Sequence, residues 1–232
     1  TVLLDGLVAG RTPLRLDGLR PGRHAVEIAQ TNYIPDQQSV ALQSGQTARV
    51  SVILPHRQIE AYRERLAKDP GDIGAYNDLG ELLFVLGRYK EAAAAYVDGF
   101  AACGEFGNRD QANSHNMGKL SQHPRQSRDQ GGVFQAELDR ALLEAVKARR
   151  LSPLLFDQFQ RIDIARCRDE YLQTYRDLVA AFPGNNGYLV NFLDFCANGG
   201  DLALLREYHG MLLARGNASA DNLLQTARLL NT

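Results

Sequence analysis

The chain has 232 residues, of which 44% are hydrophobic and 23% are charged. These values are typical of a folded protein with a buried core and exclude disorder of the whole chain. With 26 basic and 27 acidic side chains the formal net charge is −1, so the chain has no global field that attracts nucleic acid or an anionic membrane. No apolar stretch approaches the ~20 residues that span a bilayer. We therefore expect no nucleic-acid partner and no direct membrane insertion.

Residues 1–54 alternate between short apolar runs and turns rich in glycine and proline. The runs lie at residues 2–4, 14–16, 24–29, 40–42 and 48–54. Alternation with a period of two is typical of strands with one buried face, so we predict a small antiparallel β-sandwich as the first domain. The first run starts at Thr1 without an initiator Met or a leader, and we expect the chain to be a fragment or a mature region.

A series of motifs runs through the same residues: Leu4-Asp5-Gly6, Gly10-Arg11-Thr12-Pro13-Leu14, Leu19-Arg20-Pro21-Gly22, Tyr33-Ile34-Pro35 and Gly45-Gln46-Thr47. Their order resembles a PEGA domain. The resemblance implies a compact β-sandwich found in envelope or surface proteins of bacteria and archaea, with no activity of its own. Asn32 stands where the family usually has glycine, and asparagine tolerates the left-handed backbone conformation.

From residue 55 to 232 the composition changes to Ala, Leu, Glu and Arg at helical spacing, which predicts a second, all-helical domain. A helix is expected at residues 59–69. The next pattern consists of Tyr76, Leu79-Gly80, Leu83, Gly87, Tyr89, Ala92 and Tyr96. It is similar to the tetratricopeptide repeat (TPR), in which two helices pack closely and are joined by a turn. Gly99 replaces the alanine of that repeat, and we expect the second helix to fray over residues 99–104.

A weaker copy of the pattern aligns Tyr188 with Tyr76, Gly199 with Gly87 and Tyr208 with Tyr96. Further helices are predicted at residues 133–149, 153–164, 169–182 and 220–230. Because a single repeat cannot bury its apolar face alone, we expect roughly eight helices to stack into a short TPR-like solenoid. Residues 104–132 are polar and nearly free of large apolar side chains, so they are expected to form a mobile loop or, alternatively, a partner-binding loop.

Residue types that carry chemistry occur without a catalytic or metal-binding pattern. Cys103, Cys167 and Cys196 lack the spacing of a metal site or of a disulfide framework and are expected to be buried free thiols. His24 alternates in phase with Val26 and Ile28, which favours a histidine at the edge of the core over a ligand or a base. Gly118-Lys119 lacks the glycine that a phosphate loop places five residues earlier. We therefore predict no enzyme, no cofactor and no metal.

The sequence thus favours a non-catalytic interaction or scaffold protein that binds a protein or peptide in a TPR-like groove. The repeat places Gly74, Asn77, Glu81, Phe84 and Val85 on the groove side of its first helix. None of these is basic, so a cationic clamp for a C-terminal carboxylate is not supported. The resemblance to PEGA domains implies a cell-envelope location, periplasmic or extracellular. Two alternatives stay open, namely recognition of a glycan or wall polymer and an accessory role in a larger enzyme.

Overall fold

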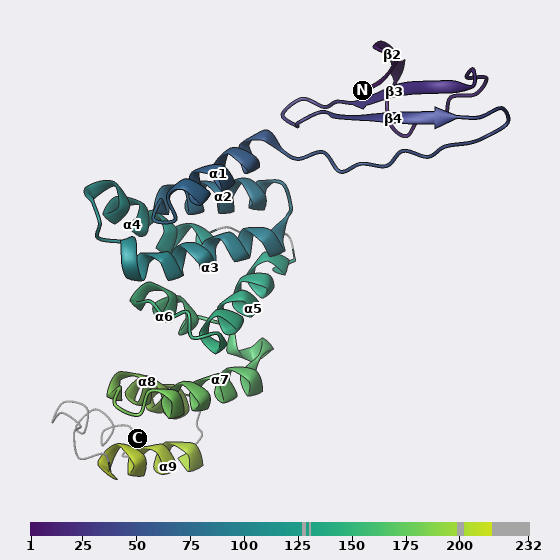
Figure 1. Ribbon diagram of the computed structural model, residues 1–232. Coiled ribbons are helices and arrows are strands. Elements are labelled where there is room, and N and C mark those ends of the chain that lie inside the picture. Colours follow the sequence, from purple (N-terminus) through teal and green to yellow (C-terminus); the bar gives the residue numbers. More distant parts are fainter. Residues whose placement is uncertain (127–128, 130, 199–201, 215–232) are drawn as a thin grey trace. The chain divides into compact units, whose positions relative to one another are not determined.

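A computed structural model describes residues 1–126, 129, 131–198 and 202–214 of the chain. It divides into two compact units, Thr1–Asp129 and Gln130–Thr232. The first unit contains a four-stranded sheet and helices α1–α4, and the second contains helices α5–α9 (Figure 1). The predicted order of a β region followed by an all-helical region is therefore found in the described residues.

The sheet is antiparallel, with the strand order β2-β1-β3-β4. Its strands are β1 (Val2–Leu4), β2 (Leu7–Gly10), β3 (Gly22–Ile28) and β4 (Asp36–Leu42). Asp5 and Gly6 join β1 to β2 with φ angles of 50° and 82°. Two positive φ angles characterise the type I′ turn, whose twist matches that of a hairpin and which Asp-Gly favours. The first hairpin thus follows directly from this dipeptide.

The sandwich predicted for residues 1–54 is not found, because the described residues form one sheet. Residues 14–16 and 48–54, where strands were predicted, have no strand structure, whereas Leu7–Gly10 is an unpredicted strand. Leu14 instead packs against β2: a Cβ added at Gly10 would lie 3.1 Å from Leu14 Cδ1. Leu14 therefore contacts the sheet through its side chain, although residues 14–16 do not join its ladder. Asn32 adopts a φ of 68°, so its predicted left-handed conformation is confirmed.

His24 links three parts of the sheet region. Its Nδ1 lies 2.8 Å from Asp5 Oδ2 and its Nε2 lies 2.8 Å from the Arg20 carbonyl oxygen. Both partners are acceptors, so the two hydrogen bonds are made together only when both ring nitrogens carry a proton. The Arg20 carbonyl and then the Asp5 carboxylate raise the pKa of His24 above its usual value. The histidine predicted at the edge of the core is thus a clamp between β3 and two loops.

Three helices follow the sheet: α1 (Arg57–Lys68), α2 (Ile73–Val85) and α3 (Tyr89–Phe106). Asp72 caps α2, since its Oδ1 accepts a hydrogen bond of 2.9 Å from the Ala75 backbone N–H. Gly87 has a φ of 71° and turns the chain between α2 and α3. This left-handed position after a helix strongly favours glycine.

Two glycines set the spacing of α2, α3 and α4 (Gln111–Gln126). A Cβ at Gly80 of α2 would lie 2.7 Å from the Tyr96 ring of α3, so the predicted close approach of these helices at Gly80 is confirmed. A Cβ at Gly99 would lie 2.8 Å from Tyr76 and 2.9 Å from Leu120 of α4. The predicted fraying of the second helix from Gly99 is wrong. Gly99 is buried and gives Leu120 room, and α3 continues to Phe106.

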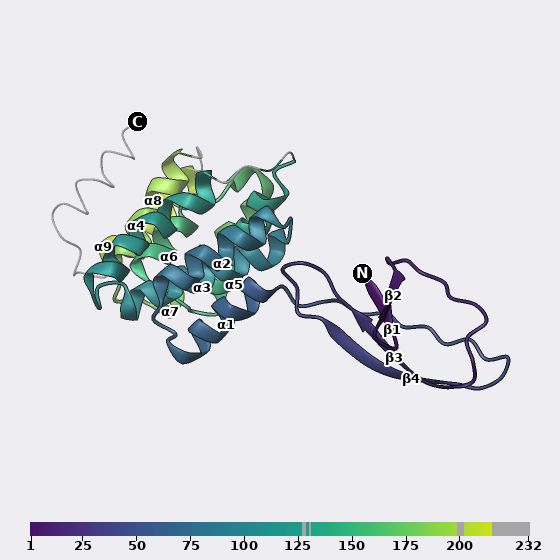
Figure 2. The same cartoon turned by 90° about the horizontal axis from the view of Figure 1, so that it is seen from above.

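The loop predicted at residues 104–132 is also wrong, because most of it is helix α4. This helix packs against α2 and α3 (Figure 1, Figure 2). Its buried residues are Asn113, Leu120 and Pro124. Only one of these is a large aliphatic residue, so the apolar periodicity that identifies an amphipathic helix is missing from the sequence.

The second unit comprises α5 (Val133–Lys147), α6 (Pro153–Phe159), α7 (Arg168–Ala181), α8 (Asn186–Asn198) and α9 (Leu202–Ala214), with a short 3₁₀ turn at Ile164–Arg166. Aromatic rings build much of its core. The rings of Phe159 and Tyr171 stack at 4.7 Å between centroids, and Phe192 of α8 meets Tyr208 of α9 edge-on at 4.6 Å. Gly199 and the helix predicted at residues 220–230 lie outside the described residues.

We expect Gly80→Ala to lower the free energy of unfolding by about 1–3 kcal/mol, because the new methyl group overlaps the Tyr96 ring. Gly118→Ala is the matched control. Gly118 is exposed on α4 with no atom within 4 Å of an added Cβ, so alanine should raise stability by up to ~1 kcal/mol. Urea unfolding followed by circular dichroism measures both. Equal effects of the two substitutions would contradict the close approach at Gly80.

We expect the sheet region to lose stability as the pH rises. Because the folded-state pKa of His24 is raised above its ordinary value of 6.5, its contribution is complete below that value and is lost as the pH rises through the folded-state pKa. The reporter is amide exchange of β3, corrected for the intrinsic pH dependence and compared with His24→Gln. Protection in the wild type should fall with rising pH, and the variant should lack this dependence. An unchanged dependence in the variant would assign it to another group.

Candidate partner-binding site

The predicted groove residues of α2 divide into buried and exposed positions. Glu81 and Val85 are exposed, and Val85 retains 75% of its accessible surface. Phe84 is half-buried, with its ring centroid 5.5 Å from that of Tyr89. Asn77 is only 4% exposed and offers almost no surface to a partner. The surface available to a partner therefore lies on the C-terminal half of α2.

Helix α4 covers the N-terminal half of α2. A Cβ added at Gly74 would lie 2.8 Å from the side-chain nitrogen of Asn116 on α4. The absence of a side chain at Gly74 therefore lets α4 approach α2 at this point. Gly74 thus serves helix packing in this structure, although the repeat pattern places it on the groove side.

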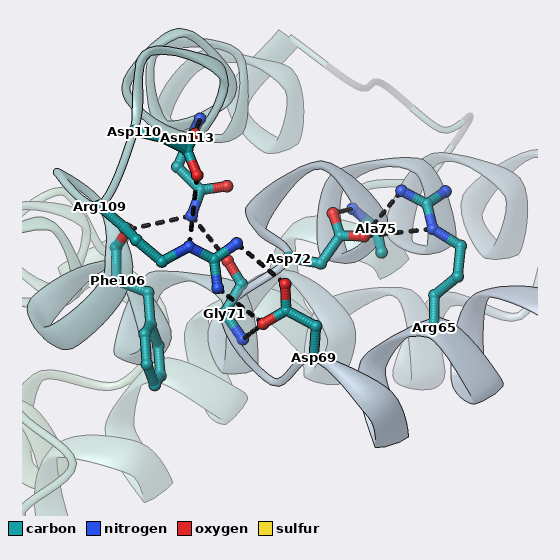
Figure 3. Close-up of polar contacts among 9 residues, drawn as sticks. All are labelled: Arg65, Asp69, Gly71, Asp72, Ala75, Phe106, Arg109, Asp110 and Asn113. Atoms are coloured by element: carbon teal, nitrogen blue, oxygen red, sulfur yellow. Dashed lines mark hydrogen bonds and ion pairs between the residues drawn. The ribbon is translucent and has the colours of Figure 1, made fainter.

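A polar clamp fixes this position of α4. It joins the turn between α1 and α2 to the turn between α3 and α4 (Figure 3). Arg109 donates two hydrogen bonds to Asp69, of 2.7 and 2.9 Å. The same carboxylate accepts a third, of 3.0 Å, from the Gly71 backbone N–H. Because Asp69 follows α1 and Arg109 precedes α4, this ion pair connects residues forty positions apart in the chain.

Asn113 is the buried centre of the clamp, with 4% of its surface exposed. Its side-chain nitrogen donates 2.7 Å to the Gly71 carbonyl and 3.0 Å to the Phe106 carbonyl (Figure 3). One amide thereby links the backbone of the turn before α2 to that of the end of α3, and each carbonyl also accepts a hydrogen bond from a backbone N–H. Its own backbone N–H donates 2.7 Å to Asp110 Oδ1, which caps the start of α4.

Charge complementarity strengthens the clamp at its surface. The Arg109 guanidinium lowers the pKa of Asp69, and the backbone N–H of Asn113 lowers that of Asp110. Arg65 of α1 also lies 2.8 Å from Asp72, the residue that caps α2. The Arg109 and Asp69 side chains keep 40% and 46% of their surface exposed, so each ion pair contributes little by itself. The buried amide of Asn113 is therefore expected to dominate the stability of the clamp.

A small cavity of about 200 Å³ opens beside Glu81. Its other lining residues are Tyr96 of α3 and His123 and Gln126 of α4. His123 and Gln126 were not predicted as groove residues, because they lie in the segment predicted as a loop. The exposed half of α2 is thus bordered by a hollow that the unpredicted helix α4 completes.

The second unit has a larger surface hollow of about 470 Å³ between α5 and α7. Its charged lining residues are Lys147, Arg149 and Asp177, and Leu178 and Phe182 contribute apolar surface. Charges of both signs therefore lie at its rim. The described contacts at this hollow do not favour one class of ligand.

The cysteines and acidic residues are dispersed. Cys103 and Cys167 are half-buried and Cys196 is buried, all as free thiols, and burial raises the pKa of Cys103 to about 11. In the described residues no group of three His, Cys, Asp or Glu side chains is placed to hold a metal ion. Over the same residues, none of the helices combines the length and apolarity of a membrane-spanning segment.

Comparison with protein families identifies the first part of the chain. Residues 1–58 match the PEGA domain, which accounts for 58 of the 232 residues and agrees with the motifs noted in the sequence. No match was found among curated proteins or solved structures.

We expect Asn113→Ala to destabilise the first unit by about 1–3 kcal/mol, since it removes two hydrogen bonds that join the turns at Gly71 and Phe106 through a buried amide. Lys119→Ala is the control, because Lys119 is exposed on the same helix and should change stability by less than about 0.5 kcal/mol. Chemical unfolding gives both values. Comparable losses in the two variants would show that the amide of Asn113 has no special role.

Proposed function

We propose that this protein is a non-catalytic interaction or scaffold protein of the bacterial cell envelope. In this proposal a protein or peptide partner binds along the exposed half of α2, beside α4. The PEGA domain orients or anchors the helical region at the envelope. The sequence patterns and the contacts of the first unit support this proposal more than an enzymatic role.

The contacts of α2, α3 and α4 support a TPR-like arrangement. Gly80 of α2 receives the Tyr96 ring of α3, and Gly99 receives Tyr76 and Leu120, at the positions where the repeat pattern places its helix contacts. The pair of α8 and α9 has a related contact, in which Phe192 takes the place of Gly80 and meets Tyr208. In this second pair, a larger residue at the position of Gly80 still contacts the tyrosine at the position of Tyr96. We infer that the helical region is built from two divergent repeats of this kind.

The observation that carries the proposal is the exposure of apolar side chains on a helix that is otherwise well anchored. Val85 is 75% exposed and Leu86 is 38% exposed, with Phe84 beside them and Glu81 one turn earlier. Exposed apolar residues that adjoin a rigid helix and a hollow are typical of helix-groove or peptide recognition. No basic residue lies on α2, so the surface favours apolar and uncharged or cationic partner segments over anionic ones.

The envelope location is supported by the match to the PEGA domain over residues 1–58. This domain is typically found in extracellular or periplasmic proteins. Glycan recognition receives less support, because the chain has no Trp. Tyr33, the aromatic that would serve as a sugar platform, packs edge-on against His56 with 5.0 Å between ring centroids. An accessory role in a larger enzyme stays an alternative that the full gene would test.

We expect Val85→Glu combined with Glu81→Lys to abolish partner capture from a native envelope extract, with retained proteins identified by mass spectrometry. Both residues are exposed, so the fold should be unchanged, which circular dichroism checks. Leu213→Glu is the matched control, because it places the same charge on a leucine that is 55% exposed on α9. Capture that survives the double substitution would remove α2 from the proposal. Capture lost equally in the control would assign it to non-specific apolar contact.

A further inference from the structure

Strand β4 has an open edge, and the chain that follows it is not paired. After β4 the chain turns back and runs past the sheet to α1 (Figure 1). In residues 47–54, which we call the strap, Val50, Val52 and Leu54 are half-buried, whereas Ser51 and Ile53 are exposed. This alternation is that of a strand with one covered face, although the strap makes no ladder with β4 in the structure.

The hydrogen bonds of the sheet show which backbone groups of β4 point outward. Thr1 and Ala29 exchange both of their backbone hydrogen bonds, and Asp5 N–H donates to Ala25. The odd-numbered residues of β3 therefore direct their backbone groups toward β1, and the even-numbered ones toward β4. β3 pairs with β4 so that even residues face even residues, as in His24 with Val40.

It follows that the odd-numbered residues of β4 turn their backbone groups away from β3. These residues are Gln37, Ser39 and Ala41, and their side chains lie on the exposed side of the strand. The half-buried side chains belong to the even-numbered residues, which include Val40 and Leu42. A fifth strand would therefore bond to odd-numbered residues and cover the side of Val40 and Leu42 with its apolar residues.

Hydrogen bonds on either side of the strap define a pairing register. In this register a fifth strand could not both bond to odd-numbered residues of β4 and cover the side of Val40 and Leu42. At the start, Gln46 N–H donates 3.1 Å to the Gln43 carbonyl. At the end, Tyr33 pairs with His56 in an isolated antiparallel bridge. In both pairs the residue numbers sum to 89. If this register continued along β4, Val50 would lie opposite Ser39 and share its exposed face, because side chains of opposed residues point the same way.

A shift of one residue removes this conflict. When the residue numbers sum to 90, Val50 lies opposite Val40 and Val52 opposite Gln38, so the half-buried side chains of both segments share a face. Near the bridge between Tyr33 and His56, the set of residues whose backbone groups point outward already changes from odd-numbered to even-numbered. Ile34 N–H donates 2.8 Å to the Pro55 carbonyl, so an even residue points outward there, whereas odd residues do so in β4. A change of this kind requires one extra residue, a β-bulge, at Ile34–Pro35.

We propose that the strap closes on β4 as a fifth strand in the register that sums to 90, with one bulge at Ile34–Pro35 and one just after Gln46. The closed strap hydrogen-bonds to Gln37, Ser39 and Ala41, and it covers an edge that carries no Lys, Arg or Pro to block pairing with another chain. The tied ends hold the strap near this edge. In the open form that the structure describes, the same edge is available to an extended segment.

The closed register makes a prediction for individual amides. Arg49, Ser51 and Ile53 should be protected from hydrogen exchange, because their N–H groups point toward β4. Their neighbours Val50 and Val52 should exchange at least about tenfold faster. Exchange measured by NMR on the full chain distinguishes the registers, since a sum of 89 protects Ala48, Val50 and Val52 instead. Protection of that set, or exchange of the whole strap at the rate of an unfolded chain, would overturn the proposal.

Disulfide trapping gives an independent readout with a matched control. Val40→Cys with Val50→Cys should cross-link rapidly on oxidation, because the two positions form a directly opposed pair in the proposed register. Ser39→Cys with Val50→Cys tests the register that sums to 89 and shares one of the two cysteines. Peptide mapping identifies the bond in the presence of the three native thiols. Faster cross-linking of the second pair, or no cross-linking of either pair, would contradict closure in this register.

Discussion

The first unit depends on how the buried backbone groups at the ends of its helices are satisfied. Helix ends leave carbonyls and N–H groups without partners inside the helix, and burying them without a partner costs free energy. Asn113 adds a side-chain donor to the carbonyls of Gly71 and Phe106, each of which also accepts a hydrogen bond from a backbone N–H. One buried amide therefore joins the turn before α2 to the end of α3, at the point where Asp110 caps α4.

The exposed surface of α2 is a consequence of this arrangement. Helix α4 packs beside Gly74, and Asn77 is buried, so Glu81 and Val85 are left as the part of α2 that a partner can reach. The hollow next to Glu81 has walls from α3 and α4 as well. Its shape therefore depends on the clamp, although the clamp lies at the other end of α2. Helix α4 is held by the neutral hydrogen bonds of Asn113 and by the ion pair of Arg109 with Asp69. These contacts keep the exposed surface of α2 and the hollow beside it in one position.

The parts of the fold that the sequence predicted are those in which the signal is local. The Asp5-Gly6 turn, the turn at Gly87 and the contact at Gly80 follow from residue types with strong conformational or steric preferences. Helix α4 was not predicted because one of its buried residues is an asparagine, Asn113, whose partners lie forty-two and seven positions away in the chain.

The candidate site shows the same division. The exposure of Glu81 and Val85 follows from helical spacing alone, since both lie on the side of α2 away from Leu79 and Leu83, which are buried. The contribution of His123 depends on α4, which the sequence pattern did not predict, and the burial of Asn77 is a tertiary feature that the repeat pattern does not indicate. The residues predicted for the groove thus include two exposed positions, Glu81 and Val85, and one buried position, Asn77.

The residues that end the strap also begin the helical region, which limits how far the strap can move. Tyr33 pairs with His56. The Tyr33 carbonyl accepts a hydrogen bond of 3.0 Å from Arg57 Nε, and the Arg57 backbone N–H donates to the Asn32 carbonyl. Arg57 is the first residue of α1, so these bonds anchor the strap and the helix together. Opening of the strap therefore stops at His56 and leaves α1 attached to the sheet. The conflict of register is confined to the residues between this anchor and the turn at Gln43, where the side-chain pattern and the tied ends differ by one residue.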